Sequence, residues 1–318
     1  MVSALACVFA ITRESLVAPG VGRDTPQARN RQGRKAKERN HNLAPALEIL
    51  PDQAGGLLDD LTKIVARACT VIRDISPTAA GRQLKPDQSP VTAADVASEA
   101  VILEGLAKLL PEVPVLSEEM ASTKGAPALD GSFFVVDPLD GTREYIAGRD
   151  EFTVNLGIVT RGTPILGIVA APNRGLVWRG IVGGQAERLR LTADGADQPQ
   201  AIRTRRWPTR GGVAVVSRSH LDPDTKSFLE KLGKVEQLPS GSAIKFCQVA
   251  DAMADVYPRL ATTCEWDVAP GHALVVAAGG IVTKPDGESL TYGHADKNFR
   301  IPSFIAWGDP AKAASVEN

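Results

Sequence analysis

The stretch SFFVVDPLDGT, residues 132–142, places two carboxylates directly after a run of apolar residues. So apolar a run is typical of a buried strand, and Asp137 at its end therefore lies at the edge of the core. Pro138 fixes its own φ angle, which makes the turn rigid and lets Asp137 and Asp140 converge. Gly141 follows where a helix could begin, and free backbone N–H groups at such a place suit a phosphate.

A second acidic segment, Val115-Leu-Ser-Glu118-Glu119, also ends a short apolar run and lies within twenty residues of Asp137. Carboxylates beside an anion-binding backbone make chemical sense when cations lie between them. Hard oxygen ligands select Mg²⁺, which commonly shares its coordination between protein carboxylates and a substrate phosphate. The two segments therefore predict a magnesium site. An ordinary surface turn rich in Asp and Gly is the alternative, and the buried strand argues against it.

The composition is that of a globular protein. The chain has 318 residues, 43% hydrophobic and 23% charged, which argues against wholesale disorder and fits two domains or one large α/β unit. Its net charge of −1 creates no global field toward a nucleic acid polymer or a membrane surface. No apolar run approaches the ~20 residues that span a bilayer, so no integral membrane segment is expected. Four cysteines without a Cys-x-x-Cys pair argue against a zinc knuckle or a disulfide framework and favour a reducing cytosol.

Residues 1–46 are predicted to be a disordered basic extension. Residues 1–47 hold eight Lys/Arg and three Asp/Glu, and after an apolar start they show almost no periodic apolar pattern. No Lys or Arg precedes the apolar start, which argues against a secretory signal. The extension is interpreted as a solvated tail. A tail that binds anionic partners and an over-extended reading frame are the alternatives.

Periodicity outlines the rest of the chain. Apolar residues at helical spacing from Leu57 to Ile72 predict an amphipathic helix, and Thr92 stands at the N-cap position of a second helix over Val96–Leu110. Further strands are expected at 113–116, 132–136, 152–159, 165–170 and 212–217, and further helices at 225–232, 243–253 and 268–278. Pro270 is expected in the first turn of the last helix, where Pro is tolerated.

A division into domains follows from a change in composition. The stretch at 183–208 is rich in Gly, Gln, Asp and Arg, and we interpret it as a junction. The predicted domains cover 47–188 and 189–308, and residues 309–318 form a tail.

Residues 137–142 match the signature of the inositol monophosphatase superfamily of Mg²⁺-dependent, Li⁺-sensitive phosphatases, which the chain resembles from about residue 50 to 307. Family blocks occur in the same order at 85–95 (KPDQSPVTAAD), 115–119 (VLSEE), 141–146 (GTREYI), 151–155 (EFTVN) and 265–267 (EWD). Blocks similar to the 3′(2′),5′-bisphosphate nucleotidase branch, the bacterial CysQ group, occur at 217–220 (SRSH), 241–247 (GSAIKFC) and 254–259 (ADVYPR). The resemblance implies an α/β (α+β) fold, a layered α-β-α-β-α sandwich of the inositol monophosphatase and fructose-1,6-bisphosphatase type.

The resemblance also implies a catalytic centre with two or three Mg²⁺ ions. The implied metal ligands are acidic side chains and one backbone carbonyl: Glu118, Asp137, Asp140, Asp267 and the carbonyl of Leu139. All of these except Asp137 are also expected to contact the substrate. Asp95 and Thr142 correspond to the pair that orients and deprotonates the attacking water, with Glu118 close to the same water. Backbone N–H groups of Gly141 and Thr142 would hold phosphate oxygens.

The acidic residues also have structural interpretations. Asp95 could be a carboxylate of a first helical turn, stabilised by the helix dipole, and Asp267 an ordinary acid before a helix. An Asp-Gly-Thr after a strand also occurs in haloacid dehalogenase phosphatases, where one residue separates the nucleophilic Asp from the next. Here Pro138 and Leu139 intervene, which favours attack by metal-bound water over a covalent intermediate.

A second anion site would distinguish a bisphosphate from other phosphate esters. Lys245 and Arg259 match positions that contact the non-reacting phosphate in the nucleotidase branch, and Ser242 adds a hydroxyl there. Arg can bind such a phosphate through two N–H groups, whereas Lys acts as a point charge. A solvated helix face is the alternative for these residues. The resemblance places His220 against the adenine, and a surface histidine is the alternative.

The expected function is hydrolysis of the 3′-phosphate of 3′-phosphoadenosine 5′-phosphate (PAP) to AMP and phosphate, with the 5′-phosphosulfate analogue (PAPS) as a further substrate. This activity belongs to sulfur metabolism and is expected in the cytoplasm, with a peripheral place on the inner membrane left open. A monomer or a homodimer fits. An inositol monophosphatase or another small phosphomonoester phosphatase is the first alternative, and a non-catalytic nucleotide-binding protein is the second.

Overall fold

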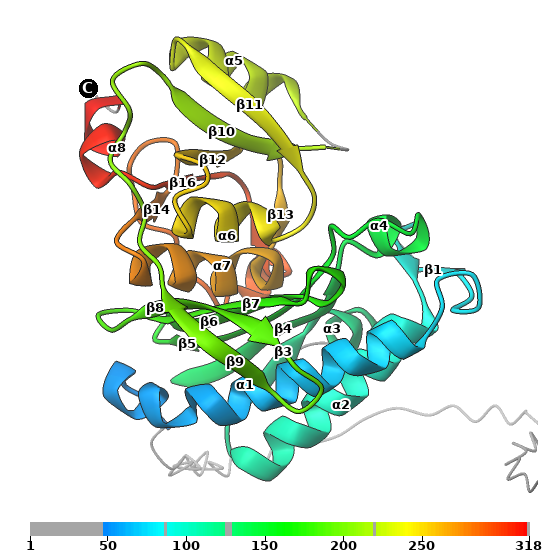
Figure 1. Ribbon diagram of the computed structural model, residues 1–318. Coiled ribbons are helices and arrows are strands. Elements are labelled where there is room, and N and C mark those ends of the chain that lie inside the picture. The colour runs from blue at the N-terminus through cyan, green and yellow to red at the C-terminus, as the bar shows by residue number, and fades with distance from the viewer. Residues whose placement is uncertain (1–46, 86–87, 125–128, 219–220, 317–318) are drawn as a thin grey trace, which may run out of the picture. The chain divides into compact units, whose positions relative to one another are not determined.

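The computed structural model describes residues 47–85, 88–124, 129–218 and 221–316 (Figure 1). They belong to one compact unit, Ala44–Asn318. The predicted basic extension at 1–46 and the candidate residue His220 lie outside the described residues. No helix in the described part of the chain is long and apolar enough to cross a membrane.

The larger sheet has seven strands, which follow one another in chain order. β3 runs parallel to β4, and the other neighbours are antiparallel. Its strands are β3 (Val115–Ser117), β4 (Ser132–Asp140), β5 (Thr153–Thr160), β6 (Thr163–Ala171), β7 (Leu176–Ile181), β8 (Ala186–Leu191) and β9 (Ala196–Ala201). The strand predicted at 132–136 is confirmed, and it continues through the acidic turn with an irregular register between Asp137 and Asp140.

Two long helices, α1 (Pro51–Asp74) and α2 (Ala93–Leu109), pack together and against this sheet. The apolar stripe predicted for α1 is buried. At the start of α2 the Thr92 hydroxyl accepts a hydrogen bond from the Ala94 N–H at 3.2 Å, which confirms the predicted N-cap. Short elements complete this half: β1 (Gln83–Leu84), β2 (Pro90–Val91), α3 (Glu118–Lys124), α4 (Thr142–Ile146) and η1 (Pro172–Arg174).

The second sheet has the strand order β11-β10-β12-β16-β14. Its strands are β10 (Gly212–Ser217), β11 (Val235–Ser240), β12 (Val256–Arg259), β14 (Ile281–Thr283) and β16 (Phe304–Trp307). Strand β10 shows how its faces are used: Val215 packs in the core shared with α6 and α7, whereas Ala214 and Val216 pack with residues of α5 and α8. The helices and small elements of this half are α5 (Pro223–Lys231), α6 (Ile244–Ala250), α7 (Glu265–Ala277), α8 (Pro310–Val316), β13 (Thr263–Cys264), β15 (Arg300–Ile301) and η2 (Ala295–Lys297).

The layers therefore follow the order α1/α2, seven-stranded sheet, α6/α7, five-stranded sheet, α5/α8 (Figure 1). Helix α7 contacts strands of both sheets, and α6 contacts α7 and the second sheet. This order confirms the predicted α-β-α-β-α sandwich. The segment predicted as a tail at 309–318 carries helix α8.

Helix α7 approaches the larger sheet closely because glycines face it. A Cβ on Gly167 would lie 1.9 Å from the carbonyl oxygen of Pro270, and a Cβ on Gly180 would lie 2.7 Å from the Cβ of Ala277. The expectation that Pro270 lies in the first turn is wrong: α7 begins at Glu265, so Pro270 lies in the second turn, inside the helix. The N-cap Cys264 marks that earlier start.

Strands β8 and β9 lie within the stretch at 183–208 that the composition suggested as a junction. The chain passes between the two sheets over 202–211. Strand β8 buries only Ala186 and Leu189, while its polar side chains pair with neighbours, for example Arg188 with Asp251 at 2.7 Å. A strand whose polar groups are satisfied by such pairs carries little apolar periodicity, which is why its sequence resembles a loop.

Candidate active site

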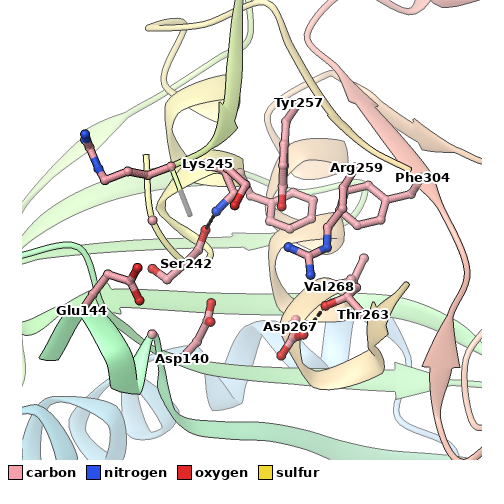
Figure 2. Close-up of a pocket in the computed structure, with 15 residues that line it drawn as sticks. Asp140, Glu144, Ser242, Lys245, Tyr257, Arg259, Thr263, Asp267, Val268 and Phe304 are labelled. Atoms are coloured by element: carbon pink, nitrogen blue, oxygen red, sulfur yellow. Dashed lines mark hydrogen bonds between the residues drawn. The ribbon is translucent and has the colours of Figure 1, made fainter. Parts of the chain in front are cut away.

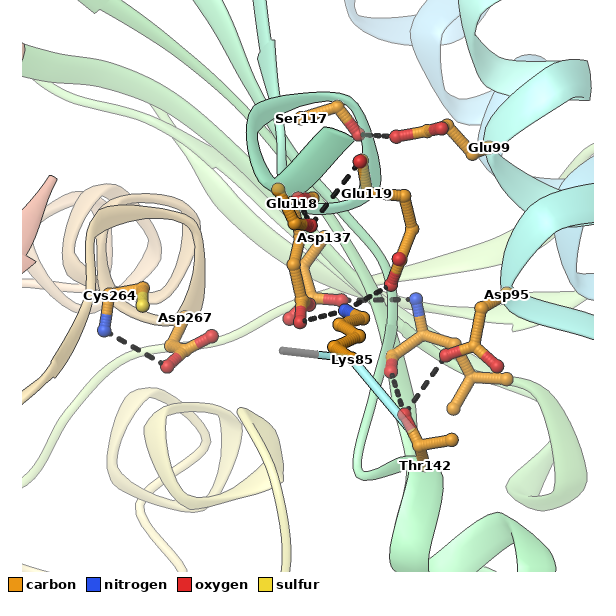
Figure 3. Close-up of polar contacts among 12 residues, drawn as sticks. Lys85, Asp95, Glu99, Ser117, Glu118, Glu119, Asp137, Thr142, Cys264 and Asp267 are labelled. Atoms are coloured by element: carbon orange, nitrogen blue, oxygen red, sulfur yellow. Dashed lines mark hydrogen bonds and ion pairs between the residues drawn. The ribbon is translucent and has the colours of Figure 1, made fainter. Parts of the chain in front are cut away.

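Three carboxylates meet where the larger sheet faces the first turn of α7. Asp137 and Asp140 come from the end of β4. Asp267 comes from α7, and Figure 3 shows it together with Asp137. Each offers an oxygen that lies within 4.8 Å of the other two. These three side chains were predicted to converge as metal ligands, and the structure brings them together.

Hydrogen bonds from the backbone orient each of the three. Asp137 accepts from the Leu139 N–H at 3.0 Å, and Asp140 accepts from the Ala243 N–H at 2.7 Å. The Asp267 carboxylate accepts from the Cys264 N–H at 3.2 Å and from the Thr263 hydroxyl. Asp137 and Asp267 are therefore held by residues close in the chain, whereas Asp140 is held by a segment 103 positions away.

Glu118 lies at the start of α3 and lines the same cavity, of about 280 Å³, as the three aspartates and Leu139. The Lys85 ammonium lies 2.7 Å from the Glu118 carboxylate and 2.6 Å from that of Glu119 (Figure 3). Lys85 is the first residue of the family block at 85–95, and no role was predicted for it. Its place in that block was the only feature of the sequence that connected it with the site.

The cavity carries more negative charge than its surroundings balance. Burial, followed by the attraction of Lys85 and the repulsion of Asp267, leaves the pKa of Glu118 raised to about 8. Burial and the neighbouring Asp267 raise the pKa of Asp140 to about 6. The pKa of Asp137 is well above its usual range for the same reasons. Carboxylate and carbonyl oxygens are the donors that hard divalent cations prefer, so this donor set fits Mg²⁺.

Asp95 and Thr142 form a hydrogen-bonded pair beside this cavity. The Thr142 hydroxyl donates to Asp95 at 2.9 Å, with the Leu139 carbonyl as a second acceptor at 3.3 Å. The other Asp95 oxygen accepts from the Thr92 N–H at 2.8 Å and from the Thr92 hydroxyl at 2.6 Å. Burial raises the pKa of Asp95. The pair is therefore arranged so that Thr142 can accept a proton from a water while Asp95 accepts the hydroxyl proton.

A second, cationic cavity of about 110 Å³ adjoins the first (Figure 2). Lys245 from α6 and Arg259 from β12 line it together with Ser242. The Lys245 ammonium donates to the Ser242 carbonyl at 2.5 Å and lies 5.2 Å from the centre of the Tyr257 ring. Burial lowers the pKa of Lys245 to about 8. The Arg259 Nε is buried without a hydrogen-bond partner among the described residues, so these cations are desolvated and suited to an anion.

The alternative of a solvated helix face does not fit these side chains, since Lys245 is only 3% exposed. Arg218 also lines the cationic cavity, and its guanidinium donates to both oxygens of Glu151 at 2.8 and 2.7 Å. Arg218 and Glu151 lie in the family blocks at 217–220 and 151–155, but no role was predicted for either residue. Glu144, which lines both cavities, was missed in the same way.

The chain is similar to known proteins over most of its length. A sequence model of the inositol monophosphatase family matches residues 57–306. The chain is 41% identical over 208 residues to the 3′(2′),5′-bisphosphate nucleotidase CysQ of Salmonella typhimurium. The aligned region covers 65% of this chain and 81% of that protein. The chain is 35% identical to the protein of the same name from Buchnera aphidicola, over 65% of this chain and 76% of that one.

Solved structures show the same architecture. The crystal structure of CysQ from Bacteroides thetaiotaomicron aligns with a TM-score of 0.65 and 31% identity, over 78% of this chain and 95% of that one. An inositol monophosphatase from Anabaena aligns with a TM-score of 0.65 over 83% of this chain and 94% of that one; at 24% identity it supports the fold alone. With its layered fold, its cluster of acidic side chains and a family match over most of its length, this chain belongs to the inositol monophosphatase family.

Proposed function

We propose that this protein is a Mg²⁺-dependent 3′(2′),5′-bisphosphate nucleotidase that hydrolyses the 3′-phosphate of PAP to AMP and phosphate. The observation that carries this proposal is the pair of adjoining cavities, one acidic and one cationic. An acidic cavity that holds divalent cations suits a reacting phosphate, and buried Lys245 and Arg259 suit a second phosphate on the same molecule. The likeness to CysQ proteins at 41% and 35% identity supports the same activity.

The residues that would hold two or three Mg²⁺ ions are Glu118, Asp137, Asp140, Asp267 and the carbonyl of Leu139. Bound there, the ions would supply positive charge against the phosphate and raise the acidity of water. The protein itself contributes the surrounding arrangement: its carboxylates are fixed before substrate arrives, so little reorganisation is needed during the reaction.

The remaining site residues bind substrate and move a proton. Thr142 orients the attacking water and accepts its proton while Asp95 accepts the proton of the Thr142 hydroxyl. Backbone N–H groups of Gly141 and Thr142 face the reacting phosphate. Lys245, Arg259 and the Ser242 hydroxyl bind the second phosphate and fix the substrate in register.

The wider expectations stay predictions: PAPS as a further substrate, action in the cytoplasm and a monomeric or homodimeric state. An inositol phosphate phosphatase would have no use for two desolvated cations beyond the reacting phosphate, which is why we place it second. A non-catalytic binding protein would not need the Asp95–Thr142 pair.

A substrate panel tests the proposed function. Phosphate release from PAP and from inositol 1-phosphate is measured on the full chain with Mg²⁺, with EDTA, and with Mg²⁺ plus Li⁺. We expect Mg²⁺-dependent, Li⁺-sensitive release from PAP. A kcat/KM for inositol 1-phosphate that is tenfold or more above that for PAP would overturn the specificity, and no Mg²⁺-dependent release from either would overturn the activity.

A further inference from the structure

The two cavities meet at a junction formed by four residues: Asp140, Gly141, Glu144 and Asp267. If the reacting phosphate lies in the acidic cavity and the second phosphate in the cationic one, the sugar that joins them lies at this junction. This step rests on the proposed function. The junction residues are therefore the ones that face the sugar.

Glu144 is the junction residue whose side chain has no other assignment. Asp140 and Asp267 belong to the metal site, and Gly141 has no side chain. Glu144 lies four residues after Asp140, on the short helix α4, and is only 9% exposed. Figure 2 shows its carboxylate directed toward Ser242 and Asp140, inside the cavity rather than toward bulk solvent.

The chemistry of a carboxylate narrows what it can meet there. An ionised carboxylate only accepts hydrogen bonds, and it repels the phosphates of the substrate. A hydroxyl on the sugar is the donor closest to the scissile phosphate. We propose that Glu144 accepts a hydrogen bond from the ribose hydroxyl vicinal to the scissile phosphate, which makes the enzyme selective for ribonucleotide over deoxyribonucleotide bisphosphates.

Lys245 and Arg218 line the cavity that Glu144 enters, and both interact electrostatically with its carboxylate. A site that hydrogen-bonds a substrate hydroxyl discriminates against the analogue that lacks it, because that analogue cannot supply the donor.

The test compares PAP with its 2′-deoxy counterpart, 2′-deoxyadenosine 3′,5′-bisphosphate. For the wild-type protein we expect kcat/KM for the ribonucleotide to exceed that for the deoxyribonucleotide by about 10- to 100-fold, the range expected of a hydrogen bond to a charged group. Glu144→Ala should reduce this ratio to about 1 by slowing the ribonucleotide alone. Glu144→Gln keeps an acceptor oxygen without the charge, so its ratio should lie between the two.

Asp150→Asn is the matched control. Asp150 lies six residues further along the chain, is 60% exposed, pairs with Arg174 at 3.3 Å and lines neither cavity. Its substitution removes the same charge from the same surface, and the ratio between the two substrates should stay at the wild-type value. A substrate with hypoxanthine in place of adenine lacks the amino donor of the base. If Glu144 binds the sugar hydroxyl and not the base, Glu144→Ala should change kcat/KM for this substrate as much as for PAP.

Two results would overturn the inference. If Glu144→Ala slows both sugars equally, Glu144 acts through Lys245 or through structure and does not read the hydroxyl. If the wild-type protein treats both sugars alike, no residue reads it. Either result leaves the proposed function intact, whereas a wild-type protein that hydrolyses neither bisphosphate removes the proposed function itself.

Discussion

Asp140 connects the two halves of the site through one side chain. It belongs to the acidic cluster, lines both cavities and accepts a hydrogen bond from the Ala243 N–H, 103 positions further along the chain. A carboxylate held by the opposite half of the unit can transmit any shift of the 241–245 segment to the metal site.

Asp140→Asn tests the metal assignment. The amide has the same shape but lacks the charge that a divalent cation needs, so we expect kcat with PAP to fall to below a tenth of the wild-type value. The melting temperature of the metal-free variant should be equal or higher, because the substitution removes repulsion with Asp267. More than a tenth of the wild-type rate in a folded variant would contradict the assignment.

Lys245→Ala tests the second anion site. Because the Lys245 ammonium is buried beside the cavity, its loss should raise KM for PAP by about tenfold or more, the effect of a lost charged hydrogen bond. KM for a 3′-monophosphate should change little. Equal effects on both substrates would show that Lys245 does not bind the second phosphate. Lys234→Ala, which lines neither cavity, is the control.

Among the elements, helix α7 has the most demanding position. It carries Asp267 in its first turn and lies between the two sheets, in contact with β4 to β7. The glycines of the sheet set how near it comes, and this distance determines where Asp267 stands relative to Asp137 and Asp140.

Gly167→Ala should therefore damage both stability and catalysis. Its Cβ would meet the backbone of Pro270, which cannot move without the helix, so we expect a loss of about 1–3 kcal/mol in the free energy of unfolding. Displacement of Asp267 should also raise the Mg²⁺ concentration for half-maximal activity. Urea unfolding and a Mg²⁺ titration measure the two effects.

Gly56→Ala is the control for that experiment. Gly56 lies within helix α1, and nothing lies within 4 Å of a Cβ placed there. Alanine should raise the free energy of unfolding by about 0.5–1 kcal/mol, since it favours the helix, and leave the Mg²⁺ dependence unchanged. A Gly167→Ala protein as stable as the wild type would contradict the close packing of α7 on β6.

At the scale of the whole molecule, the site depends on the layers staying together. Glu118, Asp137 and Asp140 come from the half with the larger sheet, whereas Asp267, Lys245 and Arg259 come from the half with the second sheet. The stability of the whole fold and the geometry of the site are therefore linked. The ionisation of His272 in the middle layer provides a way to measure that stability.

His272 in α7 predicts how stability depends on pH. Its Nδ1 lies 2.8 Å from the Tyr292 hydroxyl, and burial lowers its pKa to about 4, below the usual value of about 6.5. The unfolded chain therefore binds a proton that the folded protein does not, so the free energy of unfolding falls as pH drops from about 6.5 toward 4. This loss is absent above pH 7.

His272→Asn should remove that part of the pH dependence. Urea unfolding of both proteins at pH 7, 6 and 5 measures it, and the wild-type protein should lose about 2 kcal/mol more than the variant between pH 7 and 5. Parallel curves for the two proteins would show that folding does not lower the pKa of His272.

Much of the fold and part of the site were predictable from local patterns. The Thr92 N-cap, the apolar stripe of α1 and the buried strand before Asp137 all depend on neighbouring residues. Strands β8 and β9 were not predictable in this way, because β8 buries only Ala186 and Leu189 and β9 has no fully buried residue. The start of α7 at Glu265 was missed because Pro270 suggested a later one.

By itself the sequence determined the acidic turn after β4, the helix that begins at Thr92 and the family to which the chain belongs. The acidic turn and the helix depend on burial periodicity, the fixed φ of a proline and a hydroxyl cap, which all act over a few residues. The family depends on the order of several short motifs along the chain. Only the tertiary structure decided that Lys85 lies against Glu118 and that Glu144 stands where the two cavities join. Such contacts unite distant segments, and the packing of α7 and the two sheets, rather than any local preference, brings them within reach.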